Sequence, residues 1–392
     1  MMDKQQRGIL TLVRSAITGE VLPLPRDFDP AQAYPVVVKH QLVPLVYEGA
    51  LRCGLSRTLP TMQTLFQGYC RCLAHSERQL QMIRRLYETF DANAIDYMPL
   101  KGCNMKALYP KPELRLMGDA DILIRREQYE AIRPLVERLG MTEKVEGEYD
   151  FVWESPALKL ELHKKLVGES NRDLYGFLGD GWSLAKPVAG SRYAMGDEDQ
   201  FLYLFAHFTK HYRDGGIGIR HVVDLWVYLR THPEMDPAYL TKSLERMHLA
   251  EFYENIRQVM ACWFEDAAET DKTAFISEYV FQSGSWGTHD AHRIAANVKD
   301  VRHGGGVRRG KLRRLWMALF PELRIMQNRY PVLRKAPVLL PVFWPYRWIE
   351  AVLFRRDRVR RQRENMKGID TQEIRSYEQA LQYVGLDFHV KE

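Results

Sequence analysis

A short acidic segment that runs into an apolar one constrains this chain most strongly. Residues 119–124 read Asp-Ala-Asp-Ile-Leu-Ile. The apolar run is typical of a buried strand, and alternate residues of a strand share one face. Asp119 and Asp121 are therefore expected to point the same way. Two neighbouring carboxylates repel each other unless a positive group lies between them. A divalent cation that takes oxygen ligands is the simplest explanation for such a pair.

An alternating segment supplies a third acid. From residue 158 to residue 163, leucine alternates with Lys, Glu161 and His163. This pattern predicts a half-buried strand. If this strand pairs beside the first one, Asp119, Asp121 and Glu161 converge and can hold two metal ions for a phosphoryl displacement. The alternative is a set of solvated acids, or acids neutralised by a nearby lysine or arginine.

Three blocks of sequence follow one another in a recognisable order. The first joins Leu-Lys-Gly at 100–102, Leu-Arg at 114–115 with the acid pair, and Leu-Glu-Leu-His at 160–163. The second runs from 207 to 225, and the third, which agrees more loosely, from 319 to 341. With these blocks, the chain from about residue 95 onward resembles an uncharacterised bacterial nucleotidyltransferase family of the polymerase-β-like superfamily.

The resemblance implies an α+β nucleotidyltransferase core and a Mg²⁺-dependent reaction. A nucleoside triphosphate would give its nucleoside monophosphate to an acceptor hydroxyl or phosphate, with release of pyrophosphate. Catalysis and the binding of two Mg²⁺ ions are assigned to Asp119, Asp121 and Glu161. Nucleotide binding is assigned to Lys101, Gly102, Arg115, Lys210, His211 and Arg220. Cys103 stands where the wider superfamily has a serine, so no hydroxyl binds a phosphate at that position.

Two pairs of polar residues in the second block are spaced for a helix. His207 and His211 are four residues apart and share one helical face. They fit contact with the substrate, packing, or less readily a zinc pair. Arg220 and Asp224 have the same spacing and are expected to pair within the next helix. That pair either ties the helices together or orients Arg220 toward a phosphate.

Periodicity divides the chain into three parts. Residues 1–94 predict a helical region, with an extended helical pattern from 63 to 89. Strand and helix patterns alternate over residues 95–195, which we take as the nucleotidyltransferase core. Residues 196–392 predict a helical domain rich in aromatic side chains. The expected fold is therefore α+β, a small mixed sheet with helices that is flanked by helical regions on both sides.

Positive charge gathers in one segment of the C-terminal part. Between Arg302 and Arg363 there are seventeen Lys and Arg against three acids, whereas the whole chain has a net charge of +6. Trp344 and Trp348 lie among these cations. A basic, aromatic segment can rest on an anionic membrane surface, but a helix packed on the core with a solvated basic face explains it more readily. Nucleic acid is disfavoured because the rest of the chain is acidic and carries no recognisable binding module.

Composition sets the remaining bounds. The chain has 392 residues, of which 46% are hydrophobic and 27% charged, as in soluble globular proteins. The sequence shows no signal peptide or membrane span, and its five cysteines lack zinc-type spacing. We expect a cytoplasmic protein, with residues 302–363 allowing a peripheral position at the inner membrane face. The acceptor is open (a sugar, peptide, protein or small molecule). The alternative functions are a non-catalytic nucleotide-binding module and a membrane-surface accessory protein.

Overall fold

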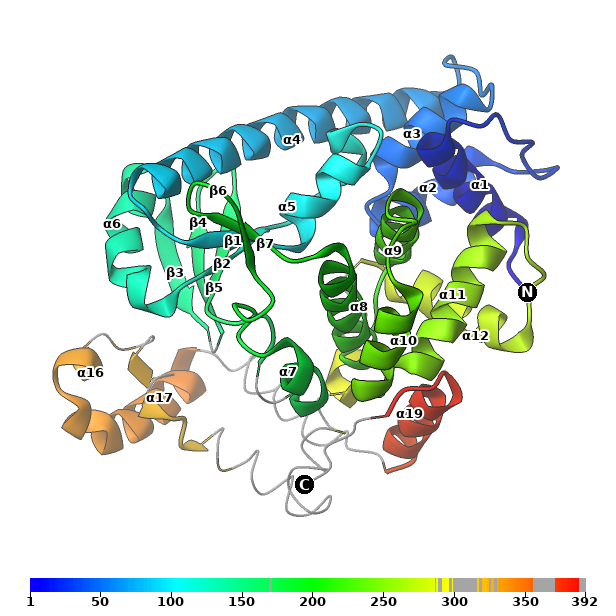
Figure 1. The fold of residues 1–392 in the computed structure, drawn as a ribbon. Helices are drawn as coiled ribbons and strands as arrows, with labels where there is room; N and C mark the ends of the chain where they lie inside the picture. Colours follow the sequence, from blue (N-terminus) through cyan, green and yellow to red (C-terminus); the bar gives the residue numbers. More distant parts are fainter. Residues whose placement is uncertain are drawn as a thin grey trace. The chain divides into compact units, whose positions relative to one another are not determined.

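The computed structural model describes most of the chain and divides it into two compact units. The described residues are 1–147, 149–168, 171–285, 287, 291–295, 298, 316, 319–323, 326–327, 330, 332–354 and 371–387. One unit comprises Met1–Tyr212, Gly216–Gly287 and Val384–Glu392, and the other comprises Arg213–Gly215 and Thr288–Tyr383. The first is called unit 1 and the second unit 2; Figure 1 shows the chain coloured along its sequence.

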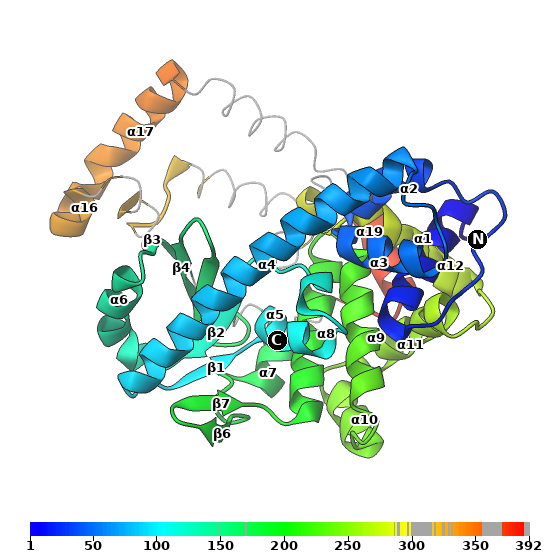
Figure 2. The same ribbon diagram turned by 90° about the horizontal axis from the view of Figure 1, so that it is seen from above.

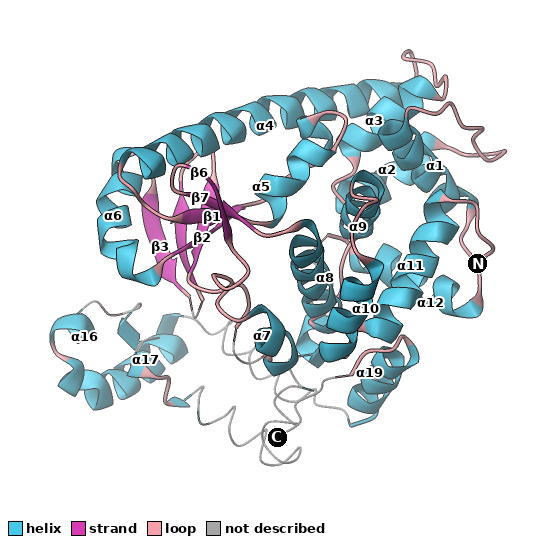
Figure 3. Ribbon diagram, in the orientation of Figure 1, coloured by secondary structure: helices cyan, strands magenta, loops and turns pink. Residues whose placement is uncertain are grey.

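Unit 1 is built on a mixed sheet. Among the described residues the sheet has seven strands, in the order β3-β4-β5-β2-β1-β7-β6 (Figure 3). The strands are β1 (Tyr97–Pro99), β2 (Ala120–Ile124), β3 (Thr142–Glu146), β4 (Asp150–Glu154), β5 (Lys159–His163), β6 (Lys186–Ala189) and β7 (Arg192–Ala194). β2 runs antiparallel to β1 and parallel to β5. The predicted α+β class is confirmed, and β2 and β5 are the neighbours that the convergence of the acids requires.

The two faces of this sheet differ sharply in polarity because successive side chains of a strand point to opposite sides. On β2, Ala120 and Ile122 belong to a buried apolar cluster, and on β5, Leu160 and Leu162 belong to the same cluster. Asp121, between two of these residues, points to the other face. Full burial of each leucine or isoleucine contributes about 1.5–3 kcal/mol. That contribution fixes the register, and with it the side on which the acids lie.

Two helices cover the apolar face of the sheet. α4 (Pro60–Ala92) and α6 (Tyr129–Arg138) supply buried residues to the same cluster as the strands, among them Leu86 and Ile132. α4 extends beyond the sheet to α2 and α3 (Figure 2). Its bounds contain the helix predicted over residues 63–89, which is therefore confirmed. Gly140, with φ +82°, follows α6 in the left-handed conformation that glycine tolerates best.

The remaining helices of unit 1 include those that form the wall opposite the acids. They are α1 (Lys4–Thr18), α2 (Pro30–Lys39), α3 (Val43–Arg52), α5 (Lys101–Met105), α7 (Arg172–Leu178), α8 (Asp197–Arg213), α9 (Ile219–Thr231), α10 (Pro237–Arg246), α11 (Ala250–Phe264) and α12 (Asp271–Ser283). α8 packs its aromatic residues Phe205, Phe208 and Tyr212 against Phe252 of α11. This apolar contact leaves the polar side chains of α8 on the side of the sheet.

Unit 2 is helical in its described part. It contains α16 (Val332–Lys335), a 3₁₀ turn (Pro337–Leu339), α17 (Leu340–Phe354) and α19 (Thr371–Tyr383). Much of the basic segment 302–363 lies outside the described residues, so no structural observation there tests its predicted contact with a membrane. Across the part of the chain that the structure describes, no helix has the length and apolar character needed to cross a membrane.

Candidate active site

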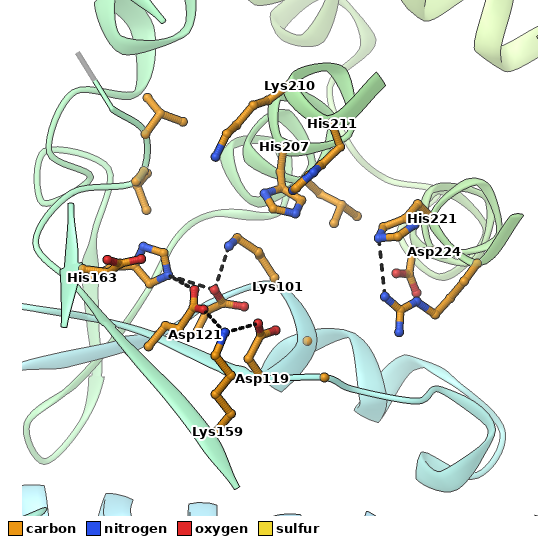
Figure 4. A pocket seen from close by; sticks show the side chains of 18 of the residues that line it. Lys101, Asp119, Asp121, Lys159, His163, His207, Lys210, His211, His221 and Asp224 are labelled. Carbon is orange, nitrogen blue, oxygen red and sulfur yellow. Dashed lines mark hydrogen bonds and ion pairs between the residues drawn. The ribbon is translucent and has the colours of Figure 1, made fainter. Parts of the chain in front are cut away.

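Asp121 is the centre of a buried polar cluster on the sheet. It pairs in register with Glu161 of β5, and His163 follows two residues later on the same face. The Asp121 carboxylate accepts a hydrogen bond from Lys101 Nζ at 2.7 Å and lies 2.8 Å from His163 Nε2 (Figure 4). The side chains of Asp121 and His163 are only 5% and 1% exposed. Such a buried carboxylate is costly unless it is paired, and here it has two partners.

A second lysine bridges the other two acids. Lys159 Nζ lies 2.6 Å from a carboxylate oxygen of Glu161 and 3.5 Å from one of Asp119. Asp119 precedes β2 and is more exposed than Asp121, with 28% of its side chain accessible. Together with Lys101, this lysine places an ammonium group beside each of the three acids. The site thus combines two of the arrangements expected from the sequence: the acids converge, and lysines neutralise them.

The charges of Lys101 and Asp121 reinforce each other. Burial raises the pKa of the Asp121 carboxyl, but the Lys101 charge and the hydrogen bond with His163 outweigh it and hold that pKa well below its usual range. Burial likewise lowers the pKa of the Lys101 ammonium, yet Asp121 outweighs it and keeps the pKa above the ordinary value. Both groups are therefore charged at neutral pH.

The donor atoms at this position fit a divalent cation. Asp121, Glu161 and His163 each offer one ligand atom, and these atoms all lie within 4.8 Å of one another. Carboxylate oxygens suit Mg²⁺ or Mn²⁺, and the imidazole nitrogen broadens the set toward transition metals. Asp119 is not part of this group of three, although it remains on the same cavity. His163 is the residue that the sequence-based assignment left out, and its place on the alternating strand was the signal for it.

The junction between β1 and α5 brings Lys101, the first residue of α5, to the acids in an unusual conformation. Lys101 has φ +35°, in the left-handed region that residues with a side chain rarely occupy. The Leu100 amide donates to the Asp121 carbonyl at 2.9 Å, which ties this loop to β2. A Cβ on Gly102 would lie 2.7 Å from Arg115 Nη1 and 2.9 Å from Met117. A side chain at position 102 would therefore push Arg115 and Met117 aside. Strained backbone of the kind found at Lys101 is concentrated at functional sites.

Helices α8 and α9 face the acids with cations and imidazoles (Figure 4). Lys210 Nζ lies 3.1 Å from the Tyr149 hydroxyl, and the rings of His207 and His211 are 4.4 Å apart. Burial, followed by the charge of Lys101, lowers the pKa of His207 well below its usual value. His207 is therefore a neutral imidazole at physiological pH. Among the described residues, neither His207 nor His211 belongs to a group that could hold a metal.

The predicted pair of Arg220 with Asp224 is wrong. Asp224 instead forms a buried ion pair with Arg115, at 3.0 Å from Nη2, and accepts a hydrogen bond from the Tyr109 hydroxyl at 2.7 Å. Arg220 donates to the Leu116 carbonyl and to the side-chain carbonyl of Gln41, in the loop after α2. Asp224 pairs with Arg115 and not with Arg220 because the Arg115 and Asp224 side chains are buried next to each other. This long-range contact overrides the local helical spacing. The guanidinium groups of Arg115 and Arg220 thus connect α9 to the segment that precedes Asp119 and Asp121.

One cavity collects these groups. It has a volume of about 320 Å³, and its lining includes all the residues assigned from sequence. Those residues are Lys101, Gly102, Arg115, Asp119, Asp121, Glu161, Lys210, His211 and Arg220. The structure adds Tyr149, Asp150, Lys159, His163, His207, His221 and Asp224 to that set. The carboxylates come from the sheet and most of the cations from the loop and helices opposite, an arrangement that suits a metal-bound, multiply charged anion.

Comparison with known families agrees with this arrangement. A family model described as an uncharacterised nucleotidyltransferase matches residues 26–265, which is more than half of the chain. The chain belongs to this family. The matched region contains the sheet, α4, α8, α9 and every assigned residue of the cavity. No curated protein and no solved structure matches the chain. Membership in this family supports a nucleotidyltransferase activity and a nucleotide substrate.

Proposed function

We propose that the cavity transfers a nucleoside monophosphate from a nucleoside triphosphate to an acceptor hydroxyl or phosphate, with release of pyrophosphate and dependence on Mg²⁺. The observation that carries the proposal is the parallel pairing of β2 with β5, which sets Asp121 beside Glu161 on the polar face. Cations then face this pair across the cavity. Membership in the nucleotidyltransferase family supports the reaction class.

The metal site falls to Asp121 and Glu161, with His163 or Asp119 completing it. A bound divalent cation would supply charge neutralisation at the phosphates and orient the reacting oxygens. Asp119 and Glu161 flank Lys159, so either carboxylate is placed to accept the proton of an incoming hydroxyl. These assignments keep the acids that the sequence singled out and add an imidazole.

The phosphates are held by the protein's own cations in this proposal. Lys101 is buried beside Asp121 and stands at the junction between metal site and phosphate site. Arg115, fixed by Asp224, presents the rest of its guanidinium near Gly102. Lys210, His211 and Arg220 line the opposite wall. Fixed donors of this kind stabilise charge that develops on a leaving pyrophosphate without reorganising during the reaction.

The test combines ligand binding with turnover. Each of the four nucleoside triphosphates is added with Mg²⁺, and thermal unfolding and pyrophosphate release are followed with sugar, peptide and protein acceptors. A ligand at a hundred times its Kd stabilises the folded state by about 2.7 kcal/mol. We expect one or more nucleotides to stabilise the wild type and to yield pyrophosphate.

Asp121→Asn decides whether the acids carry the reaction. This variant keeps the size of the side chain and removes its charge, so pyrophosphate release should fall by about a hundredfold or more. Asp27→Asn is the matched control, because the side chain of Asp27 is 76% exposed and pairs only with Lys4 among the described residues. Full activity in Asp121→Asn would refute the assignment. Nucleotide binding without pyrophosphate release would favour the non-catalytic nucleotide-binding module.

A further inference from the structure

The ammonium group of Lys159 lies between two of the three acids in the cavity. Its Nζ is 2.6 Å from Oε1 of Glu161 and 3.5 Å from Oδ2 of Asp119. An ammonium group beside two carboxylates keeps its charge at neutral pH, and hydrogen bonds between charged groups are the strong ones. Lys159 therefore neutralises part of the acid cluster from within the protein.

The register of the sheet places Lys159 there. β2 and β5 run parallel, and Asp121 pairs in register with Glu161. Two residues before this pair in each segment come Asp119 and Lys159. Side chains two residues apart point to the same face of a sheet, so an acid and a lysine stand side by side next to the pair of acids. The positive charge is thus built into the strand pairing.

The two oxygens of Glu161 divide the site into two parts. Oε1 contacts Lys159, whereas Oε2 lies 3.7 Å from Nε2 of His163. The carboxylate can therefore keep its lysine and still offer its other oxygen to a metal. The group of ligand atoms that fits a cation, among the described residues, consists of Asp121, Glu161 and His163, and it does not include Asp119.

The charges in contact with one another favour a single cation. Lys101 Nζ lies 2.7 Å from Oδ1 of Asp121, on the other side of the acids from Lys159. The three carboxylates and the two ammonium groups together leave one negative charge, which one divalent cation already reverses. The repulsion that makes a pair of metal ions attractive from the sequence is therefore largely compensated by lysines.

We infer that this site binds one divalent cation, on Asp121, Glu161 and His163, and that the Lys159 ammonium takes the place of a second one. The inference rests on the metal site of the proposed function and narrows it, since the sequence led us to expect two ions. Lys159 supplies fixed positive charge between Asp119 and Glu161 at any metal concentration. Such a charge needs no reorganisation when an anion binds.

The number of bound Mn²⁺ ions tests this inference. Mn²⁺ alone, without nucleotide, is titrated into the full chain by calorimetry, and electron paramagnetic resonance detects the coupling of two ions at the separation of about 3.5–4 Å that two-metal sites have. Lys159→Met and Lys159→Gln remove the charge, and Lys159→Arg keeps it. Lys144→Met is the matched control, because Lys144 lies on β3, is 47% exposed against 40% for Lys159, and pairs with Glu154.

We expect one Mn²⁺ per chain in the wild type, in Lys159→Arg and in the control. Both neutral variants should bind two ions with a coupled signal. Adding Asp119→Asn to Lys159→Met should remove the second ion, because Asp119 then serves as its ligand. Variants are compared where their circular dichroism matches that of the wild type.

Two ions in the wild type, or a single ion in both neutral variants, would overturn the inference and leave the proposed transfer reaction standing. The absence of any bound Mn²⁺ in the wild type would instead refute the metal site of the proposed function, and the inference with it.

Discussion

Removing Asp224 should damage unit 1 far more than its single charge suggests. The Arg115 and Asp224 side chains are 7% and 2% exposed, and their ion pair is held by two hydrogen bonds, at 3.3 Å and 3.0 Å. Asp224 also accepts the Tyr109 hydroxyl. In Asp224→Ala the guanidinium and the hydroxyl both remain buried without this partner. Breaking a buried pair in this way typically costs about 3–5 kcal/mol.

An exposed pair provides the comparison. Arg257 and Glu254 form an ion pair with side chains that are 57% and 48% exposed, so Glu254→Ala should cost no more than about 1 kcal/mol. Urea unfolding followed by circular dichroism and by tryptophan fluorescence gives both numbers, with the midpoint compared between variants because the chain has two units. Arg115→Met combined with Asp224→Ala should cost less than the sum of the single changes, because no unpaired charge remains. An Asp224→Ala variant as stable as Glu254→Ala would refute the reasoning.

Two further predictions concern a buried histidine and the glycine of the cavity. Burial lowers the pKa of His40 to about 4, and its neutral ring accepts from the Ile219 amide while Nε2 donates to the Phe281 carbonyl. As the pH falls, the His40 ring is protonated in the unfolded chain before it is protonated in the folded protein, so the free energy of unfolding should fall by up to about 3 kcal/mol between pH 6.5 and pH 4. His40→Gln should flatten that part of a profile of melting temperature against pH. An unchanged slope in this variant would contradict the prediction. Gly102→Ala should push Arg115 aside and cost about 1–3 kcal/mol, with weaker nucleotide binding measured by calorimetry. Equal nucleotide affinity in Gly102→Ala and the wild type would show that Arg115 moves aside without weakening nucleotide binding.

The sequence was most informative where local pattern and burial agree. Alternation along residues 158–163 has one solution once the leucines are buried, so the strand and the face of Glu161 could both be predicted. The acid pair before Ile122 was informative for the same reason. β6 and β7 were not anticipated, because they are short and lack buried residues that would impose a period of two.

Contacts between distant segments were beyond such reasoning. Arg115 and Asp224 are 109 residues apart, and nothing in either neighbourhood indicates the other. The spacing of Arg220 and Asp224 suggested a local pair, but a desolvated arginine elsewhere in the fold was the stronger partner. In the same way, the sequence showed three acids and several lysines without showing that Lys101 and Lys159 would lie between them.

The separation of β2 from β5 along the chain bears on how this protein folds. His163 and Asp121 touch although 42 residues separate them, and α6, β3 and β4 lie between. Such a contact closes late, because the loop entropy must be met before the pairing is gained. Lys159 arrives with Glu161 on β5, and Lys101, next to β1, meets Asp121 of β2, so the two strands that flank β2 supply the counter-ions of these acids. The sheet can therefore close on the protein's own charges, and its assembly need not wait for a metal ion from outside.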